Sequence, residues 1–207
     1  MWMPVFDQNQ HPILASYSRF KKHLEIFLGF IERENYEGLK QKLDHAHQFR
    51  QSFNDPEHRE IFAGELADIA CIAFSPSPTP LSPFSTNVLL PYAIAYAQLM
   101  SADELDPEFI SKKANASFQD ATHPATYPVE EIIYIFEKHK SDFQQIAAYF
   151  MQDLLSLMSA IESKDQETIQ HTILIAQQVR DEIPPPRRGT AVRPEYEVIH
   201  ERRCDAA

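Results

Sequence analysis

The chain has 207 residues, of which 43% are hydrophobic and 24% charged, a composition typical of a globular protein with one domain or two small ones. Its 30 Asp and Glu residues against 19 Lys and Arg residues give a net charge of −11, which disfavours binding to nucleic acid or to an anionic membrane surface. The four glycines lie at least nine positions apart, which excludes a glycine-rich dinucleotide or phosphate-binding loop.

The chain opens with a predicted helical hairpin. Residues 13–31 carry apolar side chains at alternating spacings of four and three, which places them on one stripe of an amphipathic helix of about five turns. A second apolar stripe runs from Tyr36 to Phe53, after a turn at Asn35. A third helix is predicted over residues 57–74. Residues 1–75 are therefore predicted to form an N-terminal helical unit.

Prolines divide the rest of the chain. The proline-dense segment over 76–85 predicts an extended connection, because proline lacks a backbone donor and resists a place inside a helix. The next helix is predicted over 86–101, with a kink at Pro91, and residues 106–128 are predicted to form short elements and loops. Helical periodicity then continues from Val129 to three prolines at 184–186. These patterns predict a second helical domain over 86–183 and a tail over 184–207.

The first hairpin has a copy near the end of the chain. A shift of 130 positions aligns residues 20–50 with residues 150–180, with eight identities in 31 positions and no gap. Both copies contain the pattern Ile-Glu-x-x-(Asn or Asp)-x-Glu, which places a helix end and an N-cap residue, Asn35 or Asp165, at the same point. We therefore predict a duplicated helical hairpin, with the copies packed about a pseudo-twofold axis or the chain imitating a homodimer.

Two motifs in the second half resemble a known enzyme family. Residues 90–97 read Leu-Pro-Tyr-Ala-Ile-Ala-Tyr-Ala, and residues 118–125 read Phe-Gln-Asp-Ala-Thr-His-Pro-Ala. Together with the helix-rich stretch over 132–180, they resemble the C-terminal helical dimerisation domain of prephenate and arogenate dehydrogenases. That family has a Ser-His-Leu-Pro-His run before a long apolar helix and a Phe-Arg-Asp-x-Thr-Arg-Ile-Ala run before a proline. The resemblance implies an all-α bundle of about eight helices and a link to tyrosine biosynthesis.

The chain departs from this family at its functional positions. The family's nucleotide-binding domain is missing, so no nicotinamide cofactor is expected and the chain alone should not oxidise prephenate. Residues 88–92 replace both histidines of the first motif and end in Tyr92. Gln119 and His123 stand where the family has arginines, and they lose the bidentate donor that an arginine offers a carboxylate. The resemblance implies that Tyr92, Gln119 and His123 line the remains of a substrate pocket.

These departures predict a non-catalytic accessory or regulatory protein without a cofactor. A detached dimerisation domain exposes long apolar helices, so a homodimer or a complex with a separate protein is expected, unless the duplicated hairpin covers them and gives a monomer. One alternative is a sensor that binds prephenate, arogenate, tyrosine or chorismate at His123, Gln119 and Tyr92. Another is an all-helical chorismate mutase, in which cations converge on a dicarboxylate. The candidate cations are Arg19, Lys22, Arg33, Arg50 and Arg180.

The remaining polar residues predict no metal site. A di-iron bundle needs a pair of Glu-x-x-His motifs, which this chain lacks, so the histidines are interpreted as solvated helix-face residues. Arg50 and Arg180 end the two hairpins, where the helix macrodipole favours a cation. The two cysteines, Cys71 and Cys204, lie 133 positions apart, and the N-terminus lacks the apolar segment of a secretion signal. Both features predict a reducing, cytoplasmic location. The longest apolar stretch, over 88–100, is shorter than the ~20 residues that span a bilayer.

Overall fold

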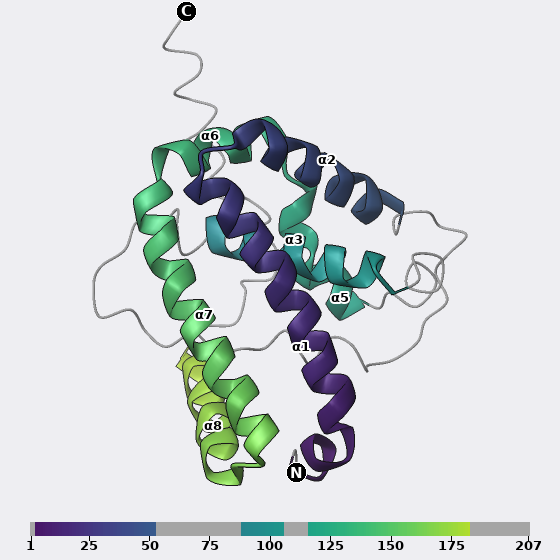
Figure 1. Cartoon of the computed structure of the whole chain (residues 1–207), viewed down its shortest axis with the longest axis vertical. Helices are drawn as coiled ribbons and strands as arrows, with labels where there is room; N and C mark the ends of the chain where they lie inside the picture. The colour runs from purple at the N-terminus through teal and green to yellow at the C-terminus, as the bar shows by residue number, and fades with distance from the viewer. Residues whose placement is uncertain (1–2, 53–87, 106–115, 183–207) are drawn as a thin grey trace, which may run out of the picture.

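The computed structural model describes residues 3–52, 88–105 and 116–182 (Figure 1). These residues form helices and no strand, which confirms the all-α fold class. The elements in chain order are α1 (Met3–Glu32), α2 (Tyr36–Ser52), α3 (Leu90–Asp103), α5 (Ala116–Ala121), the 3₁₀ helix η4 (His123–Thr126), α6 (Val129–Lys138), α7 (Lys140–Ser163) and α8 (Gln166–Glu182). The third predicted helix over 57–74, the connection over 76–85 and the tail over 184–207 lie outside the described residues. The number of about eight helices therefore stays a prediction.

Helix α1 is longer than its apolar stripe predicted. It begins at Met3 rather than at residue 13, and its backbone leaves helical geometry at Asn9, with φ −115° and ψ 18°. Pro12 lies three residues beyond this kink, in the first turn of the second segment. The first N–H groups of a helix have no intrahelical acceptor, so a proline there breaks no hydrogen bond. The predicted start after Pro12 is therefore wrong.

Pro91 lies in the first turn of helix α3. The helix begins at Leu90, which places Pro91 in its first two positions. The fixed φ of proline suits the start of a helix, where the missing N–H costs nothing. Residues 88 and 89, just before α3, form a π-helical turn, and residues 86–87 lie outside the described residues, so the predicted kink stays a prediction.

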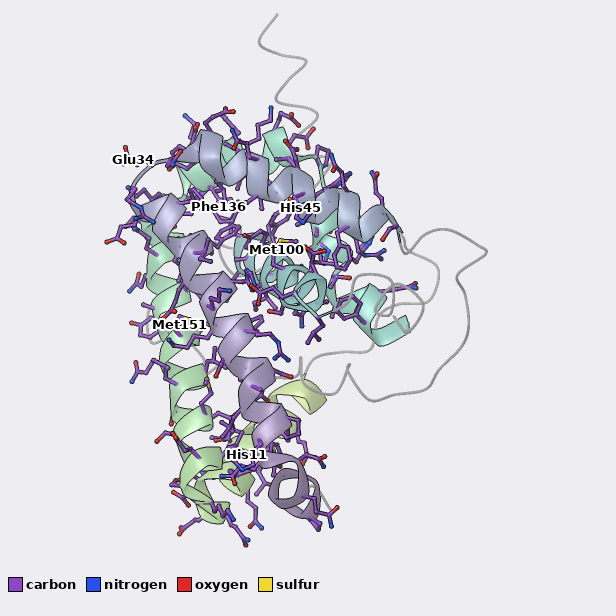
Figure 2. The ribbon with its side chains drawn as sticks, turned by 45° about the vertical axis from the view of Figure 1, so that its right-hand side comes forward. His11, Glu34, His45, Met100, Phe136 and Met151 are labelled. Carbon is purple, nitrogen blue, oxygen red and sulfur yellow. The ribbon has the colours of Figure 1, made fainter. Side chains whose placement is uncertain are left out.

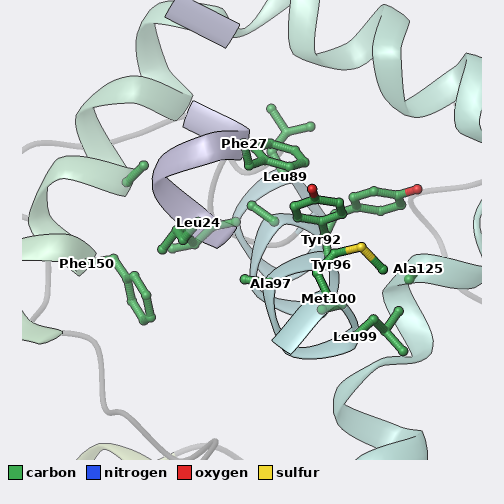
Figure 3. Packing of buried hydrophobic residues seen from close by; sticks show 14 of the residues in the cluster. Leu24, Phe27, Leu89, Tyr92, Tyr96, Ala97, Leu99, Met100, Ala125 and Phe150 are labelled. Atoms are coloured by element: carbon green, nitrogen blue, oxygen red, sulfur yellow. The ribbon is translucent and has the colours of Figure 1, made fainter. Parts of the chain in front are cut away.

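One hydrophobic cluster joins the described helices. Helix α1 packs mainly against α3 and α7, while α2 packs against α3, η4 and α6. The ring of Phe27 on α1 contacts that of Tyr96 on α3, with centroids 5.2 Å apart (Figure 3). Its centroid also lies 5.2 Å from that of Phe136 and 6.0 Å from that of Phe143. Helices from both sides of the connection over 76–85 thus share one core, and the division into domains stays a prediction.

The two hairpins turn in the same way, 130 positions apart. Helix α1 is followed by Glu34 at φ 55°, and α7 is followed by Lys164 at φ 56°. One residue later, the N–H of Asn35 donates to the carbonyl of Phe30 at 3.0 Å, and the N–H of Asp165 donates to the carbonyl five residues earlier at 2.8 Å. A left-handed residue followed by this hydrogen bond is the Schellman ending of a helix.

The same two residues then begin the next helix. Oδ1 of Asn35 accepts from the N–H of Gly38 at 3.0 Å, and Oδ1 of Asp165 accepts from the N–H of Thr168 at 3.1 Å. The hydrogen bond from the Thr168 hydroxyl lowers the pKa of Asp165. Both predicted N-caps are confirmed, because each side chain satisfies one of the free donors at a helix start.

The equivalence extends beyond the residues that the sequence aligned. His139 separates α6 from α7 with φ −118° and ψ 25°. Asn9 lies 130 positions earlier and kinks α1 with nearly the same angles. The first residues of α1 therefore correspond to the end of α6, and each copy is a kink, a long helix, a turn and a second helix.

Helices α1 and α7 run antiparallel, side by side, and join through equivalent hydrogen bonds (Figure 1). At one end, Nε2 of Gln10 donates to the carbonyl of Glu162 at 3.0 Å. At the other end, Nζ of Lys140 donates to the carbonyl of Glu32 at 3.3 Å. Lys140 is the equivalent of Gln10 and Glu162 is the equivalent of Glu32, so each bond is the image of the other.

Equivalent residues also meet in the middle of this helix pair. The rings of Phe20 and Phe150, which lie 130 positions apart, contact edge to face with centroids 6.1 Å apart. A residue that contacts its own equivalent marks a twofold axis. A pseudo-twofold axis therefore passes between α1 and α7 near Phe20, as the duplication predicted.

Candidate functional site

The three residues expected to line a pocket lie on three different elements. Tyr92 is on α3, Gln119 is on α5 and His123 opens η4. Tyr92 is 1% exposed and lies among the buried residues of the core (Figure 3). Its ring centroid is 6.5 Å from that of Phe136. Gln119 and His123 are half-buried. Tyr92 is thus part of the aromatic core, whereas the other two residues lie at the partly exposed junction of α5 and η4.

Local hydrogen bonds shape this junction. The hydroxyl of Thr122 is buried and donates to the carbonyl of Phe118 at 2.7 Å, while the hydroxyl of Thr126 donates to the carbonyl of His123 at 2.8 Å. The ring of His123 lies edge to face against Tyr127, with centroids 5.9 Å apart. Both hydroxyls therefore bond to carbonyls three or four residues earlier in the chain.

Helix α2 contributes a buried cation to the junction. Arg50 is 5% exposed, and its Nη2 donates to the carbonyl of Gln119 at 3.1 Å. This carbonyl belongs to the last turn of α5, where the macrodipole favours a cation. Arg50 therefore stabilises the end of α5 as well as standing in the last turn of its own helix. The side chain of Arg180, its equivalent, lies outside the described part of the chain.

His47 fastens α2 to η4. Its Nδ1 lies 3.0 Å from the carbonyl of Ala125, and its Nε2 lies 2.7 Å from Nε2 of Gln51. A ring protonated on Nδ1 satisfies both contacts, because it donates to the carbonyl and accepts from the amide.

Burial of Arg50 beside α5 was not predicted from the sequence, although its position on the helix indicated burial. Arg50 follows Ala46 by four residues and Leu43 by seven, so it lies on the apolar stripe of its helix. The junction gathers a guanidinium, an imidazole and an amide, which suit an anion such as a carboxylate. Two of these groups, on Arg50 and His47, already donate to backbone carbonyls.

A second polar cluster, which the sequence did not predict, lies where α3 ends. Nε2 of His45 lies 2.9 Å from Oδ2 of Asp103, and Nε2 of His23 lies 3.0 Å from Oε1 of Glu104. Lys22 forms an ion pair with the same carboxylate of Glu104. The hydrogen bond from Lys22 lowers the pKa of Glu104, and burial lowers the pKa of His23.

This cluster offsets an unfavourable charge. Two adjacent acids at the negative end of the α3 macrodipole cost stability unless cations approach them. Lys22 of α1 supplies a cation, and the imidazoles of His23 and His45 also contact the two acids, so the cluster holds α1, α2 and α3 together. Two consecutive acids at the end of a predicted helix could have indicated from the sequence that cationic or hydrogen-bonding partners lie nearby.

The cations proposed for a mutase do not converge along α1. Nη2 of Arg19 lies 3.2 Å from the hydroxyl of Ser16, Lys22 pairs with α3, and Nε of Arg33 donates to the carbonyl of Gly29 at 2.8 Å. Each contacts a different partner, so the geometry offers no shared dicarboxylate site among these three.

No group of three His, Cys, Asp or Glu side chains suited to a metal ion occurs within residues 3–52, 88–105 and 116–182. No helix in these ranges combines the length and apolar character needed to cross a membrane. No protein-family model matches the chain, and neither curated proteins nor solved structures give a match. The likeness to prephenate dehydrogenases therefore rests on the residues quoted above.

Proposed function

We propose that this protein is a non-catalytic helical scaffold that acts by association with another protein, as an accessory or regulatory relative of prephenate dehydrogenases in tyrosine biosynthesis. The main support for this proposal is that polar side chains at the expected substrate position form hydrogen bonds within the fold. Arg50 and His47 donate to backbone carbonyls of α5 and η4, and Tyr92 is packed in the core. These groups support the fold rather than an open cavity.

The pairing of α1 with α7 supports a monomer that binds a different chain. The dimerisation domain that the sequence resembles exposes long apolar helices to a partner. Here the first hairpin lies against α7, with Phe20 on Phe150. The chain thereby covers with its own duplicate a surface that a homodimer would otherwise bury.

Thermal unfolding with millimolar prephenate, arogenate, tyrosine or chorismate tests this proposal. A ligand that binds the native state at a hundredfold excess over its Kd adds about 2.7 kcal/mol of stability, which raises Tm by several degrees. We expect no shift with any of the four compounds. A reproducible shift with one of them contradicts the scaffold proposal.

A metabolite sensor is the second candidate, because the α5–η4 junction holds a buried guanidinium beside half-buried Gln119 and His123. Under this function, one of the four compounds raises Tm and the variant His123→Ala abolishes the rise. His123→Ala is the suitable variant because its side chain is half-buried, whereas truncation of Tyr92 would disrupt the core.

A further inference from the structure

The layer formed by α1 and α7 has one side that no other described helix covers. An axis that exchanges two antiparallel, adjacent helices is perpendicular to the plane that contains both. Equivalent residues of α1 and α7 therefore lie on the same side of the layer. Helices α3 and α8 lie behind α1 and α7 in Figure 1, and the turned view of Figure 2 agrees. The side that faces the viewer in Figure 1 is therefore the uncovered side.

An apolar stripe of α7 lies on this side. Met151, Leu155 and Met158 follow one another at spacings of four and three, so they share one helix face (Met151 is labelled in Figure 2). Leu155 is 45% exposed, and both methionines are half-buried against the core. On α1, half-buried Leu14 and Leu28 add apolar surface on either side of Lys21 and Glu25. We call these five residues the α1–α7 face.

The first copy of the hairpin carries charges where the second copy carries this stripe. Lys21 and Glu25 are the equivalents of Met151 and Leu155, and they form an ion pair of 2.7 Å one helical turn apart. Lys21 is half-buried and Glu25 is exposed, and a Lys–Glu pair at this spacing is common on a helix face that borders solvent. The apolar pair on α7 therefore replaces a solvated arrangement that the same backbone accommodates elsewhere in the chain.

The charges at the ends of the face indicate what it binds. Glu32 follows Leu28 by four residues and Glu162 follows Met158 by four, and both are exposed. Because α1 and α7 are antiparallel, these acids lie at opposite ends of the face. A second copy of a chain with net charge −11 would bring acids against acids, whereas basic residues would be attracted.

We propose that the α1–α7 face docks an amphipathic helix of another protein, with an apolar stripe flanked at both ends by Lys or Arg. Two antiparallel helices present a surface onto which a third helix packs through its i, i+3, i+4 and i+7 side chains. The flexible thioethers of Met151 and Met158 adapt to the shape of such a stripe. This inference rests on the proposed function, since it names the partner of the scaffold.

The test uses the full chain and defined peptides. The probe is a fluorescent 18-residue peptide with Leu at i, i+3, i+4 and i+7 positions and two Lys at each end. One control peptide has the same composition in scrambled order, and another has Glu in place of Lys. We expect saturable binding of the basic amphipathic peptide and binding at least about tenfold weaker for both controls, measured by fluorescence anisotropy.

A matched pair of variants locates the site. Met151→Lys with Leu155→Glu gives α7 the ion pair that α1 carries, and we expect it to weaken peptide binding at least about tenfold. Leu174→Asp replaces another exposed leucine, on α8, with the residue of its equivalent Asp44, and we expect it to leave binding unchanged. Unchanged far-ultraviolet circular dichroism and Tm confirm that both variants are folded.

Three results overturn the docking proposal. The first is no binding of the basic peptide, and the second is equal binding by the wild type and the Met151→Lys, Leu155→Glu variant. The third is a wild-type dimer that this double variant converts to a monomer, which assigns the face to a second copy. If the peptide does not bind and no metabolite shifts Tm, only the docking proposal is contradicted. If a metabolite shifts Tm, the proposed scaffold function is contradicted.

Discussion

The two copies of the helical hairpin end their first helices with the same turn, yet their second helices have different surroundings. Helix α2 packs against α3, η4 and α6, and its Leu43 and Ala46 are 1% exposed. Helix α8 packs mainly against α7 within the described residues, and the equivalent Ile173 and Ala176 are half-buried. The turn is therefore encoded locally, whereas the burial of the second helix depends on the elements that surround each copy.

The largest effect is expected where the first copy meets the shared core. Phe27→Ala removes a fully buried ring that contacts three others, and we expect it to cost about 4 kcal/mol. The equivalent change, Leu157→Ala, removes a smaller side chain that is 7% exposed, and we expect a cost nearer to about 2 kcal/mol. Urea unfolding with a shared m-value measures both. Equal costs would contradict the asymmetry between the copies.

Local features of the fold were predictable from the sequence. The all-α class followed from apolar spacing, and the N-caps Asn35 and Asp165 followed from a short pattern whose chemistry is completed within four residues. The duplication was visible without a gap because the turns allow no change in length. The error at Pro12 has a physical cause. A proline in the first turn of a helix resembles a proline that breaks one, and only the position of the helix start distinguishes them.

The candidate site was predictable only in part. Gln119 and His123 lie on adjacent elements because they are close in sequence, and no local pattern indicated that α2 would bring His47 and Arg50 to them. The ion pairs between α1, α2 and the end of α3 likewise join residues 58 or more positions apart. Contacts at such separations depend on the packing of whole helices, which periodicity does not determine.

Alkaline pH should destabilise the fold through Tyr17, a residue of the first copy. Burial raises the pKa of Tyr17 to about 12, and the second copy has Ala147 at this position. A raised native pKa means that the neutral phenol stabilises the fold below the unfolded pKa of 10. This stability is lost as pH rises from about 10 to about 12, on the order of 3 kcal/mol at ~1.4 kcal/mol per unit. Burial likewise raises the pKa of Tyr96 to about 12.

Urea unfolding midpoints between pH 8 and pH 12 measure this loss. Tyr17→Phe keeps the buried ring and removes the titrating group, so we expect its stability to fall less steeply than that of the wild type. Tyr134→Phe is the control, because Tyr134 is 59% exposed. We expect this variant to follow the wild-type profile. Identical slopes for all three proteins would show that burial of Tyr17 does not contribute.

The smallest effect concerns the residues that pack inside each turn. A Cβ added at Gly38 would lie 2.6 Å from Cε1 of Phe30, whereas the second copy has Thr168 and Ala160 at these positions. A large residue beside glycine in one copy thus corresponds to a small residue beside threonine in the other. We expect Gly38→Ala to cost about 1 kcal/mol, because overpacking exceeds the gain in helix propensity.

A double-mutant cycle isolates this compensation. In a Phe30→Ala background the added methyl group has room, so Gly38→Ala should be neutral or stabilising, which gives a coupling of about 1 kcal/mol. The added methyl would also lie 2.9 Å from the side chain of Asn35, but this contact is present in both backgrounds and cancels in the cycle. Additive effects would mean that the glycine is required by the N-cap rather than by the ring. A coupling would show that side-chain volume is compensated in this turn, with a large Phe30 beside Gly38 in one copy and a small Ala160 beside Thr168 in the other.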